Sequence, residues 1–255
     1  MIDITGRVWS VWRRNRDAFL KTYRVNFIPP FVEPVLYLLA LGFGLGTYIE
    51  SVDGIPYPVF IAPALVSISV MYSSFFECTY SSFVRMYYQK TFDAIIATPV
   101  SIDEVIAGEM FWGATRGMIY AALMLPVLLL FGVVAMPSSL LLIPFAYLAG
   151  LLFATIGMCF TAITPGIDAL NYPAFLFITP MFLFSGTFFP LDLLPEPIRY
   201  FALAVLPLTH VVSINRAITL PAFAPANLIS LAWIAVATAF FFVLAIRLMR
   251  RRLIV

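Results

Sequence analysis

The stretch from Pro58 to Val84 reads PVFIAPALVSISVMYSSFFECTYSSFV, and it decides the class of fold. Glu77 is its only charged residue. A helix needs roughly 20 consecutive apolar residues to cross the hydrocarbon core of a bilayer, and this stretch is longer than that. It therefore predicts a helix that spans a membrane.

Five other apolar segments of similar length lie before and after this stretch. Each is long enough to cross a bilayer as a helix. Together the six segments predict an all-α integral membrane protein with six transmembrane helices. The other five run from Ile28 to Ile49, from Phe111 to Val134, from Leu140 to Ile163, from Tyr172 to Phe189 and from Leu228 to Ile246.

The composition excludes the other broad classes. Of the 255 residues, 62% are hydrophobic and 11% are charged, and the mean hydropathy is +0.99. Soluble domains are about 45–50% apolar and about 25% charged, and disordered chains contain far less apolar material. Six spans with short connections fill the chain, so we predict a single membrane domain over residues 1–255. The net charge of +2 does not indicate an acidic partner such as a nucleic acid.

Residues 1–27 predict a basic amphipathic helix that lies in the membrane interface. Ile4, Val8, Val11, Trp12, Phe19 and Tyr23 fall on one helical face, and most of the basic residues fall on the other. The apolar run that follows is too long for a signal peptide. The helix is either an anchor that sets topology or a lever that also contacts a cytoplasmic partner. Its candidate residues are Arg7, Trp12, Arg13, Arg14 and Arg16.

The distribution of basic residues fixes the orientation, because cytoplasmic connections are enriched in lysine and arginine. The connection after the first span contains Glu50 and Asp53 and no basic residue. Both termini are therefore predicted to be cytoplasmic. Arg199 and Arg216 oppose this pattern. The basic residues that support it are Arg7, Arg13, Arg14, Arg16, Lys21 and Arg24, then Arg85 and Lys90, and finally Arg247, Arg250, Arg251 and Arg252.

The longest polar cytoplasmic connection, residues 85–110, reads RMYYQKTFDAIIATPVSIDEVIAGEM. Lys90 to Ala97 suits a short helix that ends before Pro99, since the residue before a proline disfavours helical geometry. Ser101 and Glu104 have the spacing of a capping box, which predicts a second short helix. The two helices would form either an ordinary connector or a docking surface for a cytoplasmic protein.

The stretch SGTFFPLDLLPEPIRYFALAVLPLTHVVSINRAITLP, from Ser185 to Pro221, is apolar but interrupted by prolines. Its prolines exclude one continuous helix. Broken backbone at membrane depth is tolerated only against protein or a water-filled cavity. We therefore expect residues 190–221 to form a re-entrant helical hairpin before the last span. The hairpin either roofs an outward exit or is a structural cap on the bundle.

Three ionisable residues, Glu33, Glu77 and Arg116, lie within or at the edges of the spans. Such residues are costly in hydrocarbon and usually face the interior of a bundle. Glu77 and Arg116 are candidates for an ion pair, with either a structural role or a place along a transport pathway. Cys78 and Cys159 have no metal-binding spacing and read as buried hydrophobes.

The chain lacks the motifs of a nucleotide-hydrolysing enzyme. Its two lysines, Lys21 and Lys90, do not end a G-x-x-x-x-G-K-[S/T] loop, so no Walker-type phosphate cradle is present. With His210 as the single histidine, no H-E-x-x-H metal motif can form. We expect no catalytic residue, no metal and no cofactor bound by this chain.

These features together resemble the permease subunits of type-2 ATP-binding-cassette exporters. KTFDAIIATPVSIDEVIAGEM, from Lys90, resembles the cytoplasmic coupling segment of that family, and SGTFFPLDLLPEPIRYFALAVLPLTHVV, from Ser185, resembles its hairpin signature. EPVLYLLALGFGLG and FFECTYSSFVRMYYQKTFDAIIATP are similar to the branch that contains the nodulation-factor exporter permease, which is associated with lipo-oligosaccharide export.

The resemblance implies a half-transporter in the cell inner membrane. Two permease copies would pair with two separate Walker-motif ATPase subunits, which bind ATP and Mg²⁺ and move an amphipathic substrate outward. Asp93→Arg or Phe92→Ala is expected to uncouple transport while folding survives. The implied ATPase-coupling residues are Lys90, Thr91, Phe92, Asp93, Ala94, Ile95, Ile96 and Ala97. The implied hairpin residues are Ser185, Gly186, Pro190, Asp192, Pro195, Arg199, Pro207 and His210.

Two other classes of function stay open from the residues alone. A secondary transporter or channel would need charges at the membrane midplane or a selectivity filter, for which Glu77 and Arg116 are the available candidates. An intramembrane enzyme would need a nucleophile and base or a metal constellation, and the sequence contains neither.

Overall fold

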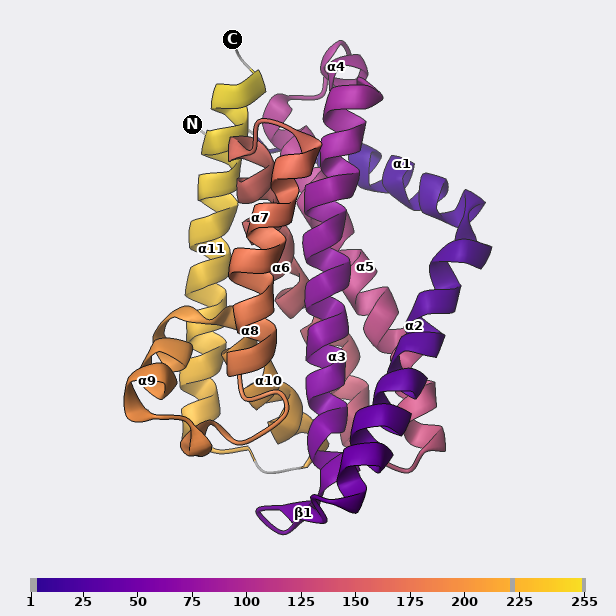
Figure 1. The fold of residues 1–255 in the computed structure, drawn as a ribbon. Helices are drawn as coiled ribbons and strands as arrows, with labels where there is room; N and C mark the ends of the chain where they lie inside the picture. Colours follow the sequence, from indigo (N-terminus) through magenta and orange to yellow (C-terminus); the bar gives the residue numbers. More distant parts are fainter. Residues whose placement is uncertain (1–3, 221–222, 254–255) are drawn as a thin grey trace.

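A computed structural model describes residues 4–220 and 223–253, and Figure 1 shows a bundle of long helices. Six stretches of helix are long and apolar enough to cross a membrane, which confirms the predicted class of fold. They are Asn26–Thr47, Tyr57–Tyr88, Ile102–Leu130, Ser138–Ile163, Ile167–Phe184 and Pro225–Leu253. Residues 1–3 of the predicted interface segment and Pro221 at the end of the predicted hairpin lie outside the described residues.

The first half of the chain contains helices α1 to α5. α1 (Val8–Lys21) crosses the end of the bundle obliquely, and α2 (Tyr23–Tyr37) descends from it and continues through Leu38–Gly44 and Leu45–Thr47 (Figure 1). A short antiparallel pair, β1 (Ser51–Val52) and β2 (Ile55–Pro56), joins α2 to α3 (Tyr57–Phe76). π-Helical turns at Glu77–Ser81 and Val84–Tyr88 extend α3. α4 (Thr91–Ile96) and α5 (Ile102–Leu130) follow.

The second half completes the bundle. A short helical turn at Ser138–Leu141 leads into α6 (Leu142–Ile163), and the fifth span combines the turn Ile167–Leu170 with α7 (Asn171–Pro173), Ala174–Ile178 and α8 (Thr179–Phe184). The turn Leu191–Leu193, α9 (Glu196–Val205) and α10 (Pro207–Thr219) precede α11 (Pro225–Leu253). α1, α4 and the C-terminal end of α11 lie at the same end of the molecule, as an even number of spans requires (Figure 1).

The third span differs from the sequence prediction, because α5 begins at Ile102 rather than near Phe111. The capping box predicted at Ser101 and Glu104 is present: the Ser101 hydroxyl accepts from the backbone N–H of Glu104, and the Glu104 side chain accepts from that of Ser101. The separate second short helix is therefore wrong. No proline follows before Pro126, so nothing ends the helix before it reaches the membrane.

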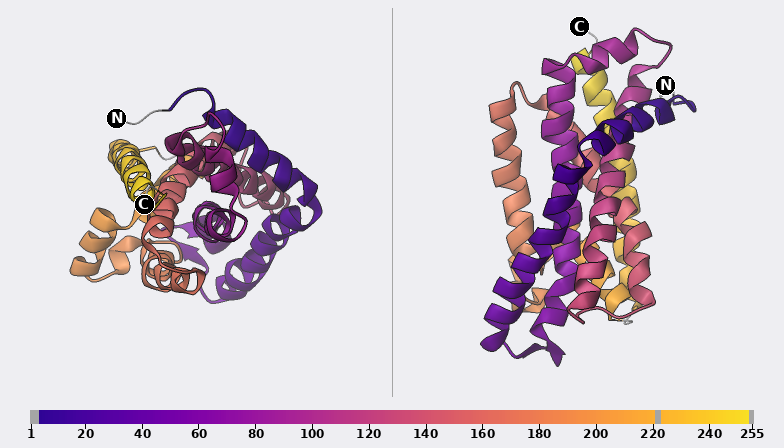
Figure 2. Two further views of the ribbon diagram at one scale, coloured as in Figure 1. Left: turned by 90° about the horizontal axis from the view of Figure 1, so that it is seen from above. Right: turned by 90° about the vertical axis from the view of Figure 1, so that its right-hand side faces the viewer.

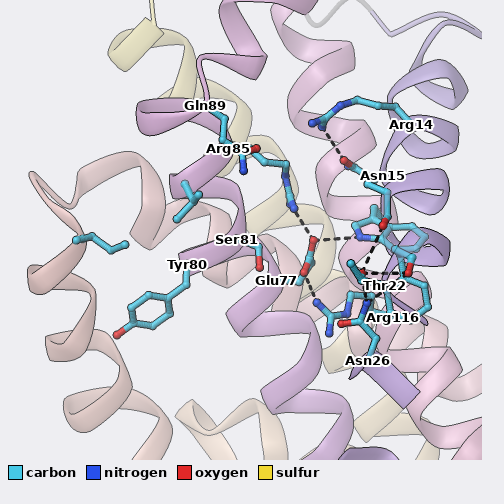
Figure 3. Close-up of a pocket in the computed structure, with 15 residues that line it drawn as sticks. Arg14, Asn15, Thr22, Asn26, Glu77, Tyr80, Ser81, Arg85, Gln89 and Arg116 are labelled. Atoms are coloured by element: carbon cyan, nitrogen blue, oxygen red, sulfur yellow. Dashed lines mark hydrogen bonds and ion pairs between the residues drawn. The ribbon is translucent and has the colours of Figure 1, made fainter. Parts of the chain in front are cut away.

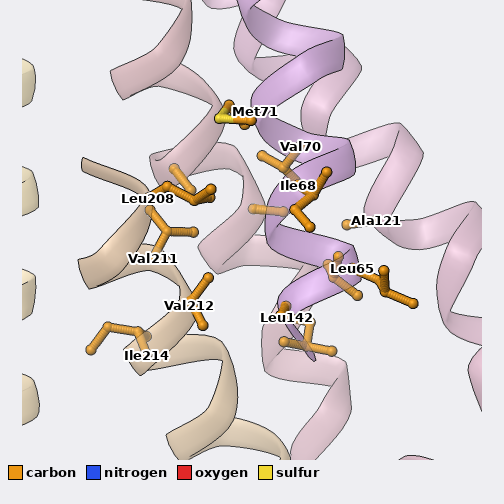
Figure 4. Close-up of a cluster of buried hydrophobic side chains, with 14 of the residues drawn as sticks. Leu65, Ile68, Val70, Met71, Ala121, Leu142, Leu208, Val211, Val212 and Ile214 are labelled. Carbon is orange, nitrogen blue, oxygen red and sulfur yellow. The ribbon is translucent and has the colours of Figure 1, made fainter. Parts of the chain in front are cut away.

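α3 is the central helix of the bundle (Figure 2). In its most apolar window 78% of the residues are buried, against 17–28% for the spans built on α2, α7–α8 and α11. The side chains of α10 pack into the same core, and Figure 4 shows Leu208 and Val212 pointing toward Ile68 of α3. The lipid-facing helices thus surround α3 and leave much of their own apolar surface exposed.

Small residues allow α3, α5 and α6 to approach closely. A Cβ on Gly117 of α5 would lie 2.5 Å from Ser74 Oγ and 3.4 Å from the Cα of Gly150 on α6. Gly42 and Gly46 of the first span, four residues apart, both lie against Pro58 at the start of α3. These two small residues therefore make a helix contact within the chain. Cys78 and Cys159 are buried free thiols.

The predicted hairpin is present as α9 and α10, which meet at a bend of 86°. Pro195 precedes α9 and Pro207 begins α10, positions where the missing N–H of proline costs no helical hydrogen bond. Gly186 has φ +71°, and a Cβ there would lie 2.9 Å from Leu191 Cγ, so the Ser-Gly turn requires glycine.

His210 ties the hairpin to the last span. Its ring nitrogens lie 2.9 Å from the Leu203 carbonyl oxygen and 3.1 Å from Ser230 Oγ, and its ring stacks on Trp233 of α11. Asp192 and Arg199 form an exposed ion pair of 2.9 Å at the start of the hairpin. α10 is largely buried against α3, whereas Ala202 is the one buried residue of α9, so the α10 half of the hairpin packs into the bundle core.

Candidate functional site

Two segments that are far apart in the sequence meet at the end of the molecule that carries α1 and α4. The Arg7 guanidinium donates to the Pro99 carbonyl at 2.6 Å, and Arg14 Nη2 donates to Thr91 Oγ1 at 3.4 Å. The Thr5 backbone N–H donates to the Glu104 carboxylate at 3.0 Å. We call α1, α4 and the first turn of α5 the coupling surface. The predicted interface helix and the predicted coupling segment are thus parts of one structure.

The predicted coupling residues fall on two sides of α4. Lys90, Asp93, Ala94 and Ala97 are exposed, and Thr91, Ile95 and Ile96 are partly buried. The Lys90 and Asp93 side chains are 4.0 Å apart and are 67% and 62% exposed. Phe92, however, is fully buried in the cluster that also contains Met110 and Met249. Its side chain is therefore not part of the face that a partner can contact, and it instead holds α4 to the bundle.

The apolar face of α1 lies on α5. The sequence predicted that this face lies in the membrane interface; in the structure Val8, Val11 and Phe19 are instead buried against the protein, whereas Ile4 and Tyr23 are exposed. The Trp12 indole N–H donates to Thr115 Oγ1 at 2.8 Å. Arg13 and Arg16 are exposed on the opposite side. α1 is therefore anchored to the body of the protein and still presents a basic face.

Gly108 sets the distance between α1 and α5. A Cβ at this position would lie 2.6 Å from Val11 Cβ and 3.0 Å from the Val8 carbonyl oxygen. We predict that Gly108→Ala displaces α1 and lowers the free energy of unfolding by about 1–3 kcal/mol, as is typical of overpacked contacts. Denaturant titration in mixed micelles checks this prediction. The control is Gly6→Ala, where a Cβ would meet nothing within 4 Å, and equal stability of the two variants would contradict the packing argument.

A buried charge cluster lies between α3, α5 and α1. Its members are Glu77, Arg85, Glu109 and Arg116. Arg116 forms an ion pair with Glu77, so the pairing that the sequence left open is present. Arg85 pairs with both carboxylates: its Nη2 lies 2.9 Å from Glu77 Oε1, and its Nε donates to Glu109 Oε2 at 3.0 Å. The Glu77 and Glu109 side chains are 2% and 0% exposed.

Neutral donors complete the cluster. Asn15 Nδ2 of α1 donates to Glu109 at 2.8 Å, the Ser82 hydroxyl donates to Glu109 at 2.7 Å, and the Trp112 indole N–H donates to Glu77 at 3.0 Å. Buried charges are tolerated only when they are paired and hydrogen-bonded in this way. The Asn15 contact makes α1 part of the cluster and links the coupling surface to the interior of the bundle.

Local backbone geometry positions the cluster. Glu77 begins the first π-helical turn after α3, and Arg85 lies in the second. π-Helical turns change the direction in which side chains leave a helix and are frequent at functional sites. On α5, Glu109, Trp112 and Arg116 have i, i+3, i+7 spacing and share one face. The sequence prediction missed Glu109, Trp112 and Asn15, and this spacing is the signal that could have found the first two.

A cavity of about 500 Å³ opens beside the cluster (Figure 3). α1, α5 and the two π-helical turns that follow α3 provide most of its wall. The charged residues that line it are Arg14, Glu77, Arg85 and Arg116, and Glu109 lies behind them. Burial lowers the pKa of Arg14 below its ordinary value, because water is partly excluded around its guanidinium.

The third predicted ionisable residue, Glu33, does not join this cluster. It is partly buried on α2 beside Leu36 and Tyr37, and among the described residues it has no hydrogen-bond or ion-pair partner. At the opposite end of the molecule, a second cavity of about 550 Å³ lies under the hairpin. Its lining includes the predicted hairpin residues Ser185, Pro190, Asp192 and Arg199, together with Arg216.

The arginines at the end of α11 also bind within the chain. Arg250 pairs with the buried Asp103 at the start of α5. Arg252 Nη1 donates to the Ala162 carbonyl at 3.3 Å and to the Thr164 carbonyl at 2.6 Å. A cation at the C-terminus of α6 satisfies carbonyls that lack helical partners. These basic residues therefore fix α5, α6 and α11 together in addition to supporting the predicted orientation.

The six apolar helices define an integral membrane protein, in which α1 and α4 are joined at one end of the bundle. The chain belongs to the ABC-2 type transporter family, whose sequence model matches residues 6–220. It is thus the membrane subunit of an ABC exporter system.

Three relatives match between 73% and 96% of the chain. Nodulation protein J of Sinorhizobium fredii (strain NBRC 101917 / NGR234) is 33% identical over 96% of this chain and 93% of that protein. Nodulation protein J of Rhizobium leguminosarum bv. viciae is 35% identical over 83% of this chain and 82% of that protein. The inner membrane transport permease YadH of Escherichia coli is 25% identical over 73% of this chain and 72% of that protein.

Proposed function

We propose that this chain forms half of the membrane part of an ATP-driven exporter. Two copies pair with two separate Walker-motif ATPase subunits, which bind ATP and Mg²⁺. The chain lies in the cell inner membrane with both termini in the cytoplasm. The observation that carries the proposal is the joining of α1 and α4 into one coupling surface through Arg7 and Arg14.

A series of hydrogen bonds and ion pairs connects α4 to the interior of the bundle. A partner that contacts Asp93 and the exposed face of α4 moves α1 with it, because Arg14 links Thr91 to α1. Asn15 carries that movement to Glu109 on α5, and Arg85 carries it to Glu77 on α3. Closure of the ATPases therefore shifts α1, α3 and α5 together.

The substrate we propose is amphipathic: a glycolipid, a lipo-oligosaccharide or a hydrophobic small molecule. The support is the set of relatives named Nodulation protein J, together with the apolar surface that the outer helices expose. The substrate leaves the cytoplasm or the inner leaflet and moves outward.

Asp93→Arg tests the coupling step. The introduced positive charge would face the partner surface that Asp93 contacts. A pair of like charges across an interface costs several kcal/mol of binding free energy. We expect a fall of about tenfold or more in ATP-driven transport. The measurement is uptake of a fluorescent lipid into inverted vesicles that contain the co-purified ATPase. Asp168→Arg, an exposed carboxylate outside the coupling surface, should stay within about twofold of the wild type.

Two outcomes would overturn the proposal. Wild-type transport by a folded Asp93→Arg variant would remove α4 from the coupling step. Purification without any ATPase subunit, combined with solute flux down an ion gradient in liposomes, would favour the secondary transporter or channel.

A further inference from the structure

The cavity beside the charge cluster carries an excess of positive charge. Three arginines line it, Arg14, Arg85 and Arg116, and Glu77 is the one acidic residue among its described lining. Including the fully buried Glu109 behind the wall, three positive and two negative charges give a net charge of +1. An uncompensated charge in a partly buried site is costly. The charge balance therefore points to an anion.

Two of the arginines have guanidinium N–H groups that no carboxylate accepts from in the described structure. Among the described residues, no carboxylate lies within ion-pair distance of Arg14, whose guanidinium donates to the neutral side chains of Asn15 and Thr91. Arg116 lines the same cavity, and its Nη2 has only a 3.5 Å hydrogen bond, to the Tyr120 hydroxyl; its Nε has no hydrogen-bond partner in the described structure but is buried out of reach of the cavity. Guanidinium groups are donors only, so the complementary ligand is an acceptor such as a phosphate.

The position of the cavity corresponds to the level of lipid headgroups. Its wall includes Thr22, directly after α1, and Asn26, where the first apolar span begins. The wall residues from Glu77 to Arg85 lie in the last part of the second span, after α3, and Gln89 directly follows that span. α1 itself is amphipathic and exposes Trp9, as expected for a helix in the interface. Basic pockets between helices at this depth bind anionic headgroups.

We propose that this cavity binds the phosphate of an anionic phospholipid from the inner leaflet, held by the guanidinium groups of Arg14 and Arg116. The single negative charge of a phosphodiester balances the net charge of the site. The lipid then bridges α1 and α5 beside their direct contact, because Arg14 lies on α1 and Arg116 lies on α5. The assignment to the inner leaflet rests on the orientation proposed above, whereas the binding does not depend on an ATPase partner.

The test uses the full chain purified in a neutral detergent. Its affinity for phosphatidylglycerol is measured by titration of the thermal unfolding midpoint and by native mass spectrometry, with phosphatidylcholine as the reference lipid. Arg14→Gln should weaken the binding of phosphatidylglycerol about tenfold or more, because it removes a charge-assisted hydrogen bond. Arg13→Gln, which removes the same charge from the exposed side of α1, should change it by less than about twofold.

A second variant keeps the test decisive if Arg14→Gln folds poorly. Gln89→Glu is nearly isosteric, lies on the exposed edge of the cavity wall, and adds a negative charge there. It should also weaken binding several-fold, by like-charge repulsion.

Three results would overturn the proposal. Equal affinity for the two lipids would exclude a headgroup site. Equal losses for Arg13→Gln and Arg14→Gln would show general attraction of a basic helix to an anionic surface. Equal stabilisation by inorganic phosphate at the same concentration would show that the cavity takes the free anion and not a lipid. Because none of these measurements involves ATP or transport, failure here leaves the proposed export function standing.

Discussion

Glu109→Ala is expected to destabilise the protein strongly. Glu109 is fully buried and accepts hydrogen bonds from Asn15, Ser82 and Arg85. Removing it leaves Arg85 with one carboxylate partner where it had two, and breaking a buried pair costs about 3–5 kcal/mol. Denaturant titration in mixed micelles should show a loss of that size. Transport should fall with it, because α1 loses the hydrogen bond from Asn15 that connects it to the charge cluster.

A double-mutant cycle separates the charge interaction from the lost volume. Arg85→Met removes the cation that Glu109 neutralises. The double variant should lose less free energy of unfolding than the sum of the two single variants, with a coupling energy of about 1–3 kcal/mol. Additive losses would show that Glu109 and Arg85 do not stabilise each other in the folded protein.

Phe92→Ala is expected to detach α4 from the bundle. The Phe92 side chain is fully buried among its neighbours. Truncation of a buried phenylalanine typically costs about 3–5 kcal/mol of the free energy of unfolding. Since α4 has only six residues, the loss should appear as local opening. Cleavage by a lysine-specific protease after Lys90 should accelerate on the order of 100-fold, since each 1.4 kcal/mol corresponds to a factor of ten.

The chain provides two controls for this experiment. Lys21, the other lysine, lies on α1 and should be cleaved at an unchanged rate. Phe175→Ala removes a phenylalanine that is 71% exposed and should leave cleavage after Lys90 unaltered. Transport with normal coupling by Phe92→Ala, at an unchanged rate of cleavage, would contradict the anchoring role. Asp93→Arg, in contrast, should leave the cleavage rate unchanged and affect coupling alone.

Local signals predicted most of the fold. The length of each apolar run was enough to place six spans, because burying backbone in a bilayer requires a helix of about that length. The capping box at Ser101 and the prolines before α9 and α10 act within a few residues, and all three mark helix starts in the structure. The predicted break between a second short helix and the third span was wrong, because α5 is continuous from Ile102 to Leu130. A capping box marks where a helix begins and gives no information about its end.

The candidate site was predicted in part. The sequence selected residues 90–97 and the basic amphipathic helix, and the structure joins them through Arg7 and Arg14. It also selected Glu77 and Arg116, which pair. Glu109 was missed because it precedes the apolar run and therefore reads as a loop residue. Phe92 was assigned to a docking face because its burial comes from Met110 and Met249, residues distant in sequence.

Hydropathy, proline and short motifs act over single segments, so the sequence alone was enough to predict that this protein crosses a membrane and where most of its spans lie. Only the tertiary structure decided that Arg85 neutralises two carboxylates, that Asn15 connects α1 to α5, and that a cavity with excess positive charge lies between them. Pairing and cavities depend on which helix faces meet. That choice follows from close packing at positions such as Gly108 and Gly117, and no periodicity within one segment contains it.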